Sequence, residues 1–259
     1  MLPKSLIVSA ERVRRPMMAD LAEHLTRTER DQSFANLRPK DAATIILIDR
    51  SGAEPKVLMG RRHHGHKFMP GKFVFPGGRV DARDRYVPVA GRLDPRVESG
   101  LMRRLRRPSR IRARVLAVAA IREASEETGL LLGTKVASAP KFPDGWNAFA
   151  EAGVQPDLDE LHFIARAITP PRRPRRFDTR FFAADAQAIA HRVEGIIGPD
   201  AELVELIWVP IAAAKQLDLP SITHVVLVDL EARIAAGFGH ELPVPYYRMV
   251  NRRFVRELL

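Results

Sequence analysis

The spacing of apolar residues along the chain predicts strands and helices that interleave. Residues 42–49 form a β-branched apolar run, and a turn at Ser51-Gly52 separates this run from a second one at 56–61. Strands are also predicted at 73–75, 161–168, 177–183 and 202–209, and helices at 111–127, 146–152 and 222–236. The order contains no βαβ repeat, so the pattern indicates an α/β fold that is not built from βαβ units.

The first residues carry a separate helical pattern. Val13, Met17, Leu21 and Leu25 are spaced by four, which predicts an amphipathic helix within an N-terminal extension at residues 1–38. We expect this helix to pack on the domain formed by residues 39–259 or on a second subunit.

One predicted helix carries three carboxylates on one face. Residues 111–127 contain no Pro or Gly, and Gly129 stands where a left-handed C-terminal cap is expected. Glu123, Glu126 and Glu127 follow an i, i+3, i+4 spacing, so they repel one another at the helix end where the macrodipole also disfavours acids. A bound divalent cation would compensate, and carboxylate oxygens suit Mg²⁺ or Mn²⁺. The alternative is a solvated, polar helix end.

The acidic helix resembles a known signature. Arg122-Glu123-Ala124-Ser125-Glu126-Glu127-Thr128-Gly129-Leu130 resembles the second half of the Nudix box, found in hydrolases that cut nucleoside diphosphates linked to another moiety. Gly78 fits the start of the box, and Asp84 stands where the family has Glu. An insertion at about 82–110 separates the two halves; it is either a lid that selects the substrate or an idle surface excursion. The resemblance implies a Nudix-type α/β/α sandwich with a mixed β-sheet.

Residues upstream of the box carry a second resemblance. Arg62, Lys67, Gly71 and Phe75-Pro76-Gly77-Gly78 resemble the segment before the box in coenzyme A pyrophosphatases. Together with Thr169-Pro170 and residues 176–182, the split box resembles the branch that contains the peroxisomal coenzyme A diphosphatases and their bacterial relatives. This implies coenzyme A or acyl-CoA as the first substrate to test. Nucleotide sugars, NADH, dinucleoside polyphosphates and RNA 5′ ends stay open, as does a non-catalytic nucleotide-binding sensor.

The Nudix resemblance also implies roles for individual residues. The metal would be held by Glu123, Glu126, Glu127 and the carbonyl of Gly78. Glu123, Arg122 and Glu127 would form the catalytic set, in which Arg122 orients a neighbouring glutamate and Glu123 is either a ligand or the base that orients water. The choice of general base, and of Mg²⁺ over Mn²⁺, is left open.

Other polar residues are candidates for weaker roles. Substrate binding is expected of Arg62, Lys67 and Gly77, and a further ligand or base is expected at Glu202 or Glu205. His63, His64 and His66 could form a transition-metal site, although consecutive histidines are more often part of a solvated loop.

Composition limits the class of protein. There is no cysteine, so thiolate metal sites are excluded and an oxygen-liganded metal remains. The net charge of +11 would steer anionic ligands to the protein, or it reflects a coding bias towards arginine. The arginine clusters lack interleaved aromatics, so we expect a small-molecule substrate and no nucleic acid. No apolar run approaches the ~20 residues of a membrane span and no secretory signal is evident, so a cytoplasmic protein is expected. The family resemblance is compatible with a homodimer.

Overall fold

The structure is a computed structural model that describes residues 21–28, 30–65 and 69–259. Its strands are β1 (Lys40–Asp49), β2 (Lys56–Arg62), β3 (Phe73–Val74), β4 (Gly77–Arg79), β5 (Leu130–Leu132), β6 (Thr134–Lys135), β7 (Val154–Gln155), β8 (His162–Ile168), β9 (Phe177–Asp185), β10 (Ile189–Arg192), β11 (Leu203–Pro210), β12 (Pro245–Val250) and β13 (Arg253–Leu258). Its helices are α2 (Pro95–Met102), α3 (Arg110–Thr128), α4 (Asn147–Glu151), α5 (Ile211–Ala214) and α6 (Ser221–Ala235), with short 3₁₀ turns η1 (Ala82–Tyr86) and η2 (Ala186–Ala188).

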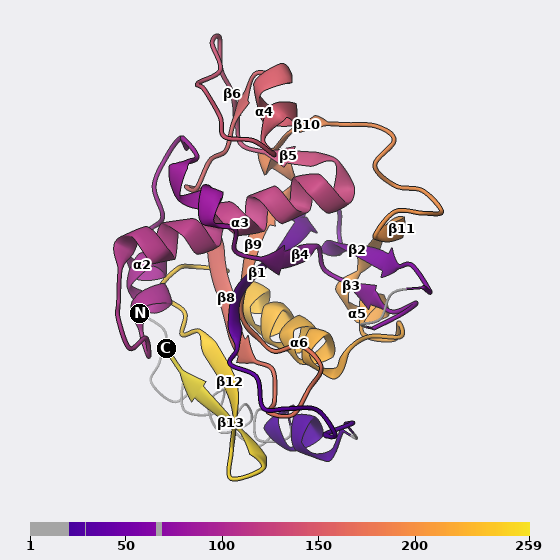
Figure 1. Cartoon of the computed structure of the whole chain (residues 1–259). Coiled ribbons are helices and arrows are strands. Elements are labelled where there is room, and N and C mark those ends of the chain that lie inside the picture. The colour runs from indigo at the N-terminus through magenta and orange to yellow at the C-terminus, as the bar shows by residue number, and fades with distance from the viewer. Residues whose placement is uncertain (1–20, 29, 66–68) are drawn as a thin grey trace, which may run out of the picture.

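A nine-stranded mixed sheet forms the centre of the molecule (Figure 1). Its order is β11-β2-β1-β9-β8-β12-β13, with β3 added to β2 and β4 added to β1. The pairs β1–β9 and β8–β12 are parallel, and the other pairs are antiparallel. The expected α/β fold with a mixed sheet is therefore confirmed.

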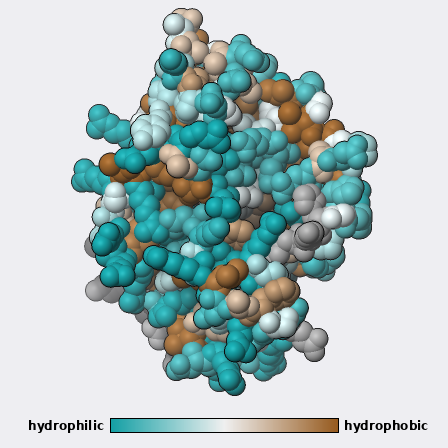
Figure 2. All heavy atoms as spheres, in the orientation of Figure 1, coloured by the Kyte–Doolittle hydropathy of each residue, from teal (hydrophilic) through white to brown (hydrophobic). Residues whose placement is uncertain are grey.

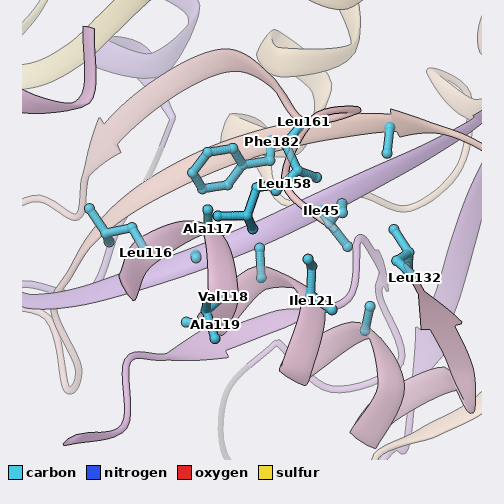
Figure 3. Packing of buried hydrophobic residues seen from close by; sticks show 14 of the residues in the cluster. Ile45, Leu116, Ala117, Val118, Ala119, Ile121, Leu132, Leu158, Leu161 and Phe182 are labelled. Atoms are coloured by element: carbon cyan, nitrogen blue, oxygen red, sulfur yellow. The ribbon is translucent and has the colours of Figure 1, made fainter. Parts of the chain in front are cut away.

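The two faces of the sheet are covered by different helices, which gives the predicted α/β/α layering. On β1, Ile45 and Leu47 belong to the hydrophobic cluster that contains α3, whereas Ile46 and Ile48 belong to the cluster that contains α6. All four are fully buried, which explains why this strand is a continuous apolar run and does not alternate with polar residues. Figure 3 shows the α3 side of this packing, where Leu116, Ala117 and Ile121 lie with Ile45 and Phe182.

Helix α3 begins and ends as its sequence predicts. The Ser109 hydroxyl accepts a hydrogen bond from the Arg112 N–H (3.4 Å) and caps the N-terminus. Gly129 adopts a left-handed conformation (φ 74°) and its N–H donates to the Ser125 carbonyl (2.9 Å). The helix therefore ends just after Glu127 and fixes the three carboxylates beside the sheet.

The insertion and the described part of the N-terminal extension both contain helices. Residues 82–110 contain η1 and α2, and α2 packs on α3. Residues 21–27 are helical, and Leu21 and Leu25 are buried in the α6 cluster, whereas Val13 and Met17 lie outside the described residues. In the described part of the chain, no helix is long and apolar enough to cross a membrane. The face seen in Figure 2 is mostly hydrophilic.

Candidate functional site

The two halves of the split motif meet beside the sheet. Strand β4 pairs with β1 and lies against α3. The Gly77 N–H donates to Glu127 Oε2 (3.0 Å), so a carboxylate of the helix is bonded to the glycine turn. A Cβ atom on Gly78 would collide with the Glu123 carboxylate, so the absence of a side chain at this position allows the close approach. The insertion therefore separates Gly78 and Glu123 in sequence only.

Arg122 connects the acidic residues of both halves. Its Nε donates to Asp84 Oδ1 (2.8 Å), and its Nη1 donates to Glu123 Oε1 (2.9 Å) and to Glu126 Oε2 (2.8 Å). Its Nη2 donates to the Arg79 carbonyl (2.7 Å). Burial opposes the charge on Arg122, but the surrounding carboxylates outweigh burial and raise its pKa. The expected orienting role of Arg122 thus has a geometric basis.

Asp84 is the inner partner of this arginine. Its side chain is fully buried, and its second oxygen accepts a hydrogen bond from the Asp81 N–H (2.8 Å). Asp81 in turn accepts from the Arg83 N–H (2.8 Å), which completes a capping box at η1. The insertion therefore begins with a turn that places a buried carboxylate under Arg122.

A cavity of about 340 Å³ opens beside the glycine turn. Glu123, Glu127 and Glu202 line it, together with Gly77, Gly78 and Arg62. Arg62 Nη1 forms an ion pair with Glu202 Oε1 (3.0 Å). Further lining residues are Thr179 and Phe181 of β9, and Pro220 and Ile222 at the N-terminal end of α6. We call this space the carboxylate cavity; its volume is at the lower end of the ~300–1,000 Å³ typical of ligand pockets.

The carboxyl groups that line the carboxylate cavity are buried and perturb one another electrostatically. Burial raises the pKa of Glu123 to about 7 against the opposing effect of Arg122, and Glu126 and Glu202 raise it further. Burial also raises the pKa of Glu127, with Glu202 as the next cause. A group of buried carboxylates with raised pKa values fits a hard divalent cation such as Mg²⁺ or Mn²⁺.

The carboxylates are not arranged as a ready-made metal centre. Within residues 21–28, 30–65 and 69–259, no three His, Cys, Asp or Glu side chains converge to form one. Arg122 draws Glu123 and Glu126 to itself, and Glu127 is bonded to Gly77. Glu126 does not line the carboxylate cavity, so of the three expected glutamate ligands the structure brings only Glu123 and Glu127 to its wall.

The other candidate residues differ in whether they reach the carboxylate cavity. Glu205 forms an ion pair with Arg61 (2.7 Å) and is not part of the cavity lining, in contrast to Glu202. The His63 ring accepts a hydrogen bond from the Gly65 N–H (2.9 Å), and the His64 ring lies 3.5 Å from Arg61. Lys67 and His66 lie outside the described residues.

Sequence reasoning missed part of the carboxylate cavity. Thr169, Thr179 and Phe181 also line it. These residues lie in or beside segments that carried the second family resemblance, but no chemical pattern marked them as site residues. Their place depends on how β9 pairs with β1, which is a long-range feature.

Comparisons with known proteins point to one family. No protein-family model matches the chain. A Nudix hydrolase from Alicyclobacillus acidocaldarius is similar at 29% identity and a TM-score of 0.59, over 79% of this chain and 96% of that chain. The Nudix domain of Shewanella oneidensis NrtR complexed with ADP ribose has 14% sequence identity and a TM-score of 0.43, and the match covers 82% of this chain and 97% of that chain. A Caenorhabditis elegans Ap4A hydrolase has 13% identity and a TM-score of 0.39, and the match covers 76% of this chain and 99% of that chain. The fold matches that of the Nudix hydrolases, and the likeness to the Alicyclobacillus protein supports the Nudix family for this chain.

Proposed function

We propose that this chain is a metal-dependent hydrolase that cleaves the diphosphate linkage of a nucleoside diphosphate derivative. Coenzyme A or acyl-CoA is the substrate that we propose to test first. The observation that carries the proposal is that Glu123, Glu127 and Glu202 line one cavity together with Arg62. Carboxylates and a cation around one cavity are what diphosphate hydrolysis requires, because phosphoryl transfer depends on positioning and charge stabilisation.

The reaction adds water across a phosphoric anhydride. Water attacks one phosphorus atom, the bond from that atom to the bridging oxygen breaks, and two phosphate monoester dianions and two protons are released. Mg²⁺ or Mn²⁺, held by Glu123, Glu126, Glu127 and the Gly78 carbonyl, would supply charge neutralisation and a more acidic water. Reaching this arrangement requires Glu126 to turn from Arg122 towards the cavity.

The chain's own residues do the positioning. Arg122 holds the Glu123 carboxylate next to Gly78 in the glycine turn. Arg62 offers a donor to a phosphoryl oxygen, because its Nε is buried and has no hydrogen-bond partner among the described residues. Glu202, which is paired with Arg62, is a candidate for the general base or for a further ligand. Lys67 and Gly77 complete the proposed substrate contacts.

The choice of coenzyme A rests on the resemblance of Arg62, Gly71 and the Phe-Pro-Gly-Gly tetrad to coenzyme A pyrophosphatases. The experiment is a screen of the full chain with Mg²⁺, Mn²⁺ or EDTA against coenzyme A, acyl-CoA, ADP-ribose, NADH and diadenosine tetraphosphate, with products resolved by mass. We expect coenzyme A derivatives to be cleaved at the diphosphate, and EDTA to abolish turnover.

Matched variants test the site. Glu126→Gln and Glu127→Gln are expected to abolish metal-dependent turnover with a native thermal midpoint, whereas Glu151→Gln, on exposed α4, keeps wild-type turnover. Turnover that survives both site changes contradicts the assignment. Tight nucleotide binding without any hydrolysis would favour a sensor instead.

A further inference from the structure

A second cavity, of about 280 Å³, lies at the N-terminal end of α3. Its lining residues in the described part of the chain are all arginines: Arg38, Arg106, Arg107 and Arg112. They come from three segments: the residues before β1, the segment between α2 and α3, and the first turn of α3. We call this space the arginine cavity. It shares no lining residue with the carboxylate cavity, and Arg112 and Glu123 lie about 16 Å apart along the helix axis.

Three of the four arginines lack a counter-charge. Arg38, Arg106 and Arg107 are exposed, and none of them forms an ion pair with another described residue. Arg112 alone has such a pair, with Asp41 (2.7 Å). No Asp or Glu is among the described residues that line the cavity. Like charges gathered around one space repel one another, and a bound anion would compensate for this repulsion.

The acidic residues behind Arg112 are already occupied. Asp41 accepts hydrogen bonds from Arg112 Nε (2.8 Å) and Nη2 (2.7 Å) and from Arg180 Nη1 (2.9 Å). Asp178 forms ion pairs with Arg166 (2.7 Å) and Arg180 (3.2 Å). Two carboxylates thus serve three guanidinium groups, and the buried Arg180 still has Nε and Nη2 without a hydrogen-bond partner among the described residues. This network has no spare negative charge to offer the arginine cavity, and its bidentate contact fixes the Arg112 side chain.

The place of the cavity on α3 adds a second charge mismatch. The first turn of α3 contains Arg110 and Arg112 and no acidic residue. The N-terminus of a helix carries positive partial charge, so anions are favoured there and cations are disfavoured. Helix α3 therefore has arginines at the end that prefers anions and glutamates at the end that prefers cations. A bound anion would relieve the first mismatch, as a bound cation would relieve the second.

The chemistry and size of the cavity limit the class of anion. Guanidinium groups donate paired hydrogen bonds in a geometry that matches phosphate oxygens. The volume of about 280 Å³ is just below the ~300 Å³ lower end of pockets that hold organic ligands, so it fits a few phosphate units better than a nucleoside. None of the described lining residues is aromatic, so the cavity offers no stacking surface for the bases of a nucleic acid.

We propose that the arginine cavity binds a small oligophosphate anion, of the size of inorganic diphosphate or triphosphate, at a site separate from the carboxylate cavity. The proposal does not depend on the proposed function, because neither the glutamates nor a divalent cation takes part. It also assigns a role to Arg106 and Arg107 of the insertion, which is neither a substrate lid nor an idle surface excursion in this respect.

Calorimetric titration with inorganic triphosphate is the direct test, on the full chain in EDTA at fixed ionic strength. Wild type should bind triphosphate about tenfold tighter than orthophosphate, because more oxygens meet more guanidinium groups. Arg38→Gln and Arg107→Gln, from different segments, should each weaken triphosphate binding about tenfold. Arg252→Gln is the matched control, since Arg252 is equally exposed and has no ion pair among the described residues. Affinity that falls in Arg62→Gln, at the carboxylate cavity, but not in these two variants overturns the proposal.

Thermal unfolding distinguishes a binding site from a structural role. Arg38→Gln and Arg107→Gln remove repulsion and no ion pair, so without anion both should unfold at a temperature no lower than wild type does. Triphosphate should raise the thermal midpoint of wild type and of Arg252→Gln, and raise that of the two cavity variants by less than about half as much. Equal rises in all four proteins would show that the anion acts elsewhere and would refute the proposal.

A short single-stranded RNA tests the competing occupant. If triphosphate binding is indifferent to Arg38→Gln and Arg107→Gln while RNA binding needs both arginines, the small-anion site is wrong and the cavity is part of a nucleic-acid surface. If no diphosphate is hydrolysed but triphosphate binds with the expected dependence on the two arginines, the proposed function fails and the arginine cavity stands.

Discussion

Removal of the Arg122 guanidinium is the most informative perturbation of the fold beside the site. Arg122→Met keeps an unbranched stem of helix-forming character but deletes every hydrogen bond that the guanidinium makes. Asp84 is affected most, because its side chain is fully buried and Arg122 is the only cation among the described residues that forms an ion pair with it. Glu126 is affected less, because its side chain is 45% exposed and can be solvated.

The magnitude follows from this burial. Breaking a buried ion pair by removing one partner costs about 3–5 kcal/mol, because a charge is left uncompensated. For a chain of this size each kcal/mol lowers the thermal midpoint by about 2–4 °C, so we expect a fall of roughly 6–20 °C. The exposed pair of Arg27 and Glu23 has the same i, i+4 spacing as Arg122 and Glu126, and Arg27→Met should cost less than ~1 kcal/mol.

The assay is urea unfolding of Arg122→Met, of Asp84→Asn and of the double variant that combines the two changes. The asparagine oxygen can still accept from the Asp81 N–H, so the second change removes the orphaned charge and keeps the cap. We expect the double variant to be more stable than Arg122→Met by at least ~1 kcal/mol, as coupled neighbours require. A cost of Arg122→Met below ~1 kcal/mol, or strictly additive changes, would refute the reasoning.

Two further predictions concern stability. Burial opposes the charge of Asp41, but hydrogen bonds and charge from Arg112 and Arg180 outweigh burial and lower the pKa of Asp41. The ionised side chain therefore stabilises the fold fully above its unfolded pKa of ~3.9, and this stabilisation is lost as pH falls through the folded pKa. The thermal midpoint of wild type should fall more steeply below about pH 4 than that of Asp41→Asn. In urea unfolding, Gly129→Ala should lower the free energy of unfolding by at least ~1 kcal/mol more than Gly195→Ala. Both glycines have positive φ (74° and 79°), but of the two only Gly129 has a neighbouring carbonyl with which a Cβ would collide. Equal losses would contradict this explanation.

The predictable part of the fold is the part with strong local signals. Helix α3, with good helix formers and Gly129 after its end, and β1, with its apolar run, were predicted nearly in full. Helix α2 was missed because its Pro and Gly residues read as breaks. Pro95 instead occupies the first turn, where its lack of an N–H costs nothing, and Asp94 caps the helix. The hairpin β12–β13 was missed because its apolar residues are mixed with arginines and carry no clear period.

The candidate site shows the same division. The shared face of Glu123, Glu126 and Glu127 follows from helical spacing alone, but the choice between Glu202 and Glu205 does not. The pairing of β11 with β2 shifts register between Leu203 and Glu205, so alternation along the strand cannot be continued back to residue 202. Only the folded sheet shows that Glu202 lies against Arg62 at the cavity.

The acidic end of α3 shares a single counter-charge in the folded chain. Acids at the C-terminal end of α3 require a counter-charge, and a single guanidinium, that of Arg122, is shared among Asp84, Glu123 and Glu126. One positive charge cannot balance three carboxylates, and the Glu127 carboxyl group accepts a hydrogen bond from the Gly77 N–H. The uncompensated charge therefore lies on the side of α3 that faces the glycine turn and the cavity. Arg122 stabilises the acidic cluster within the fold, and under the proposed function the carboxylates it leaves unpaired would attract a divalent cation to the cavity.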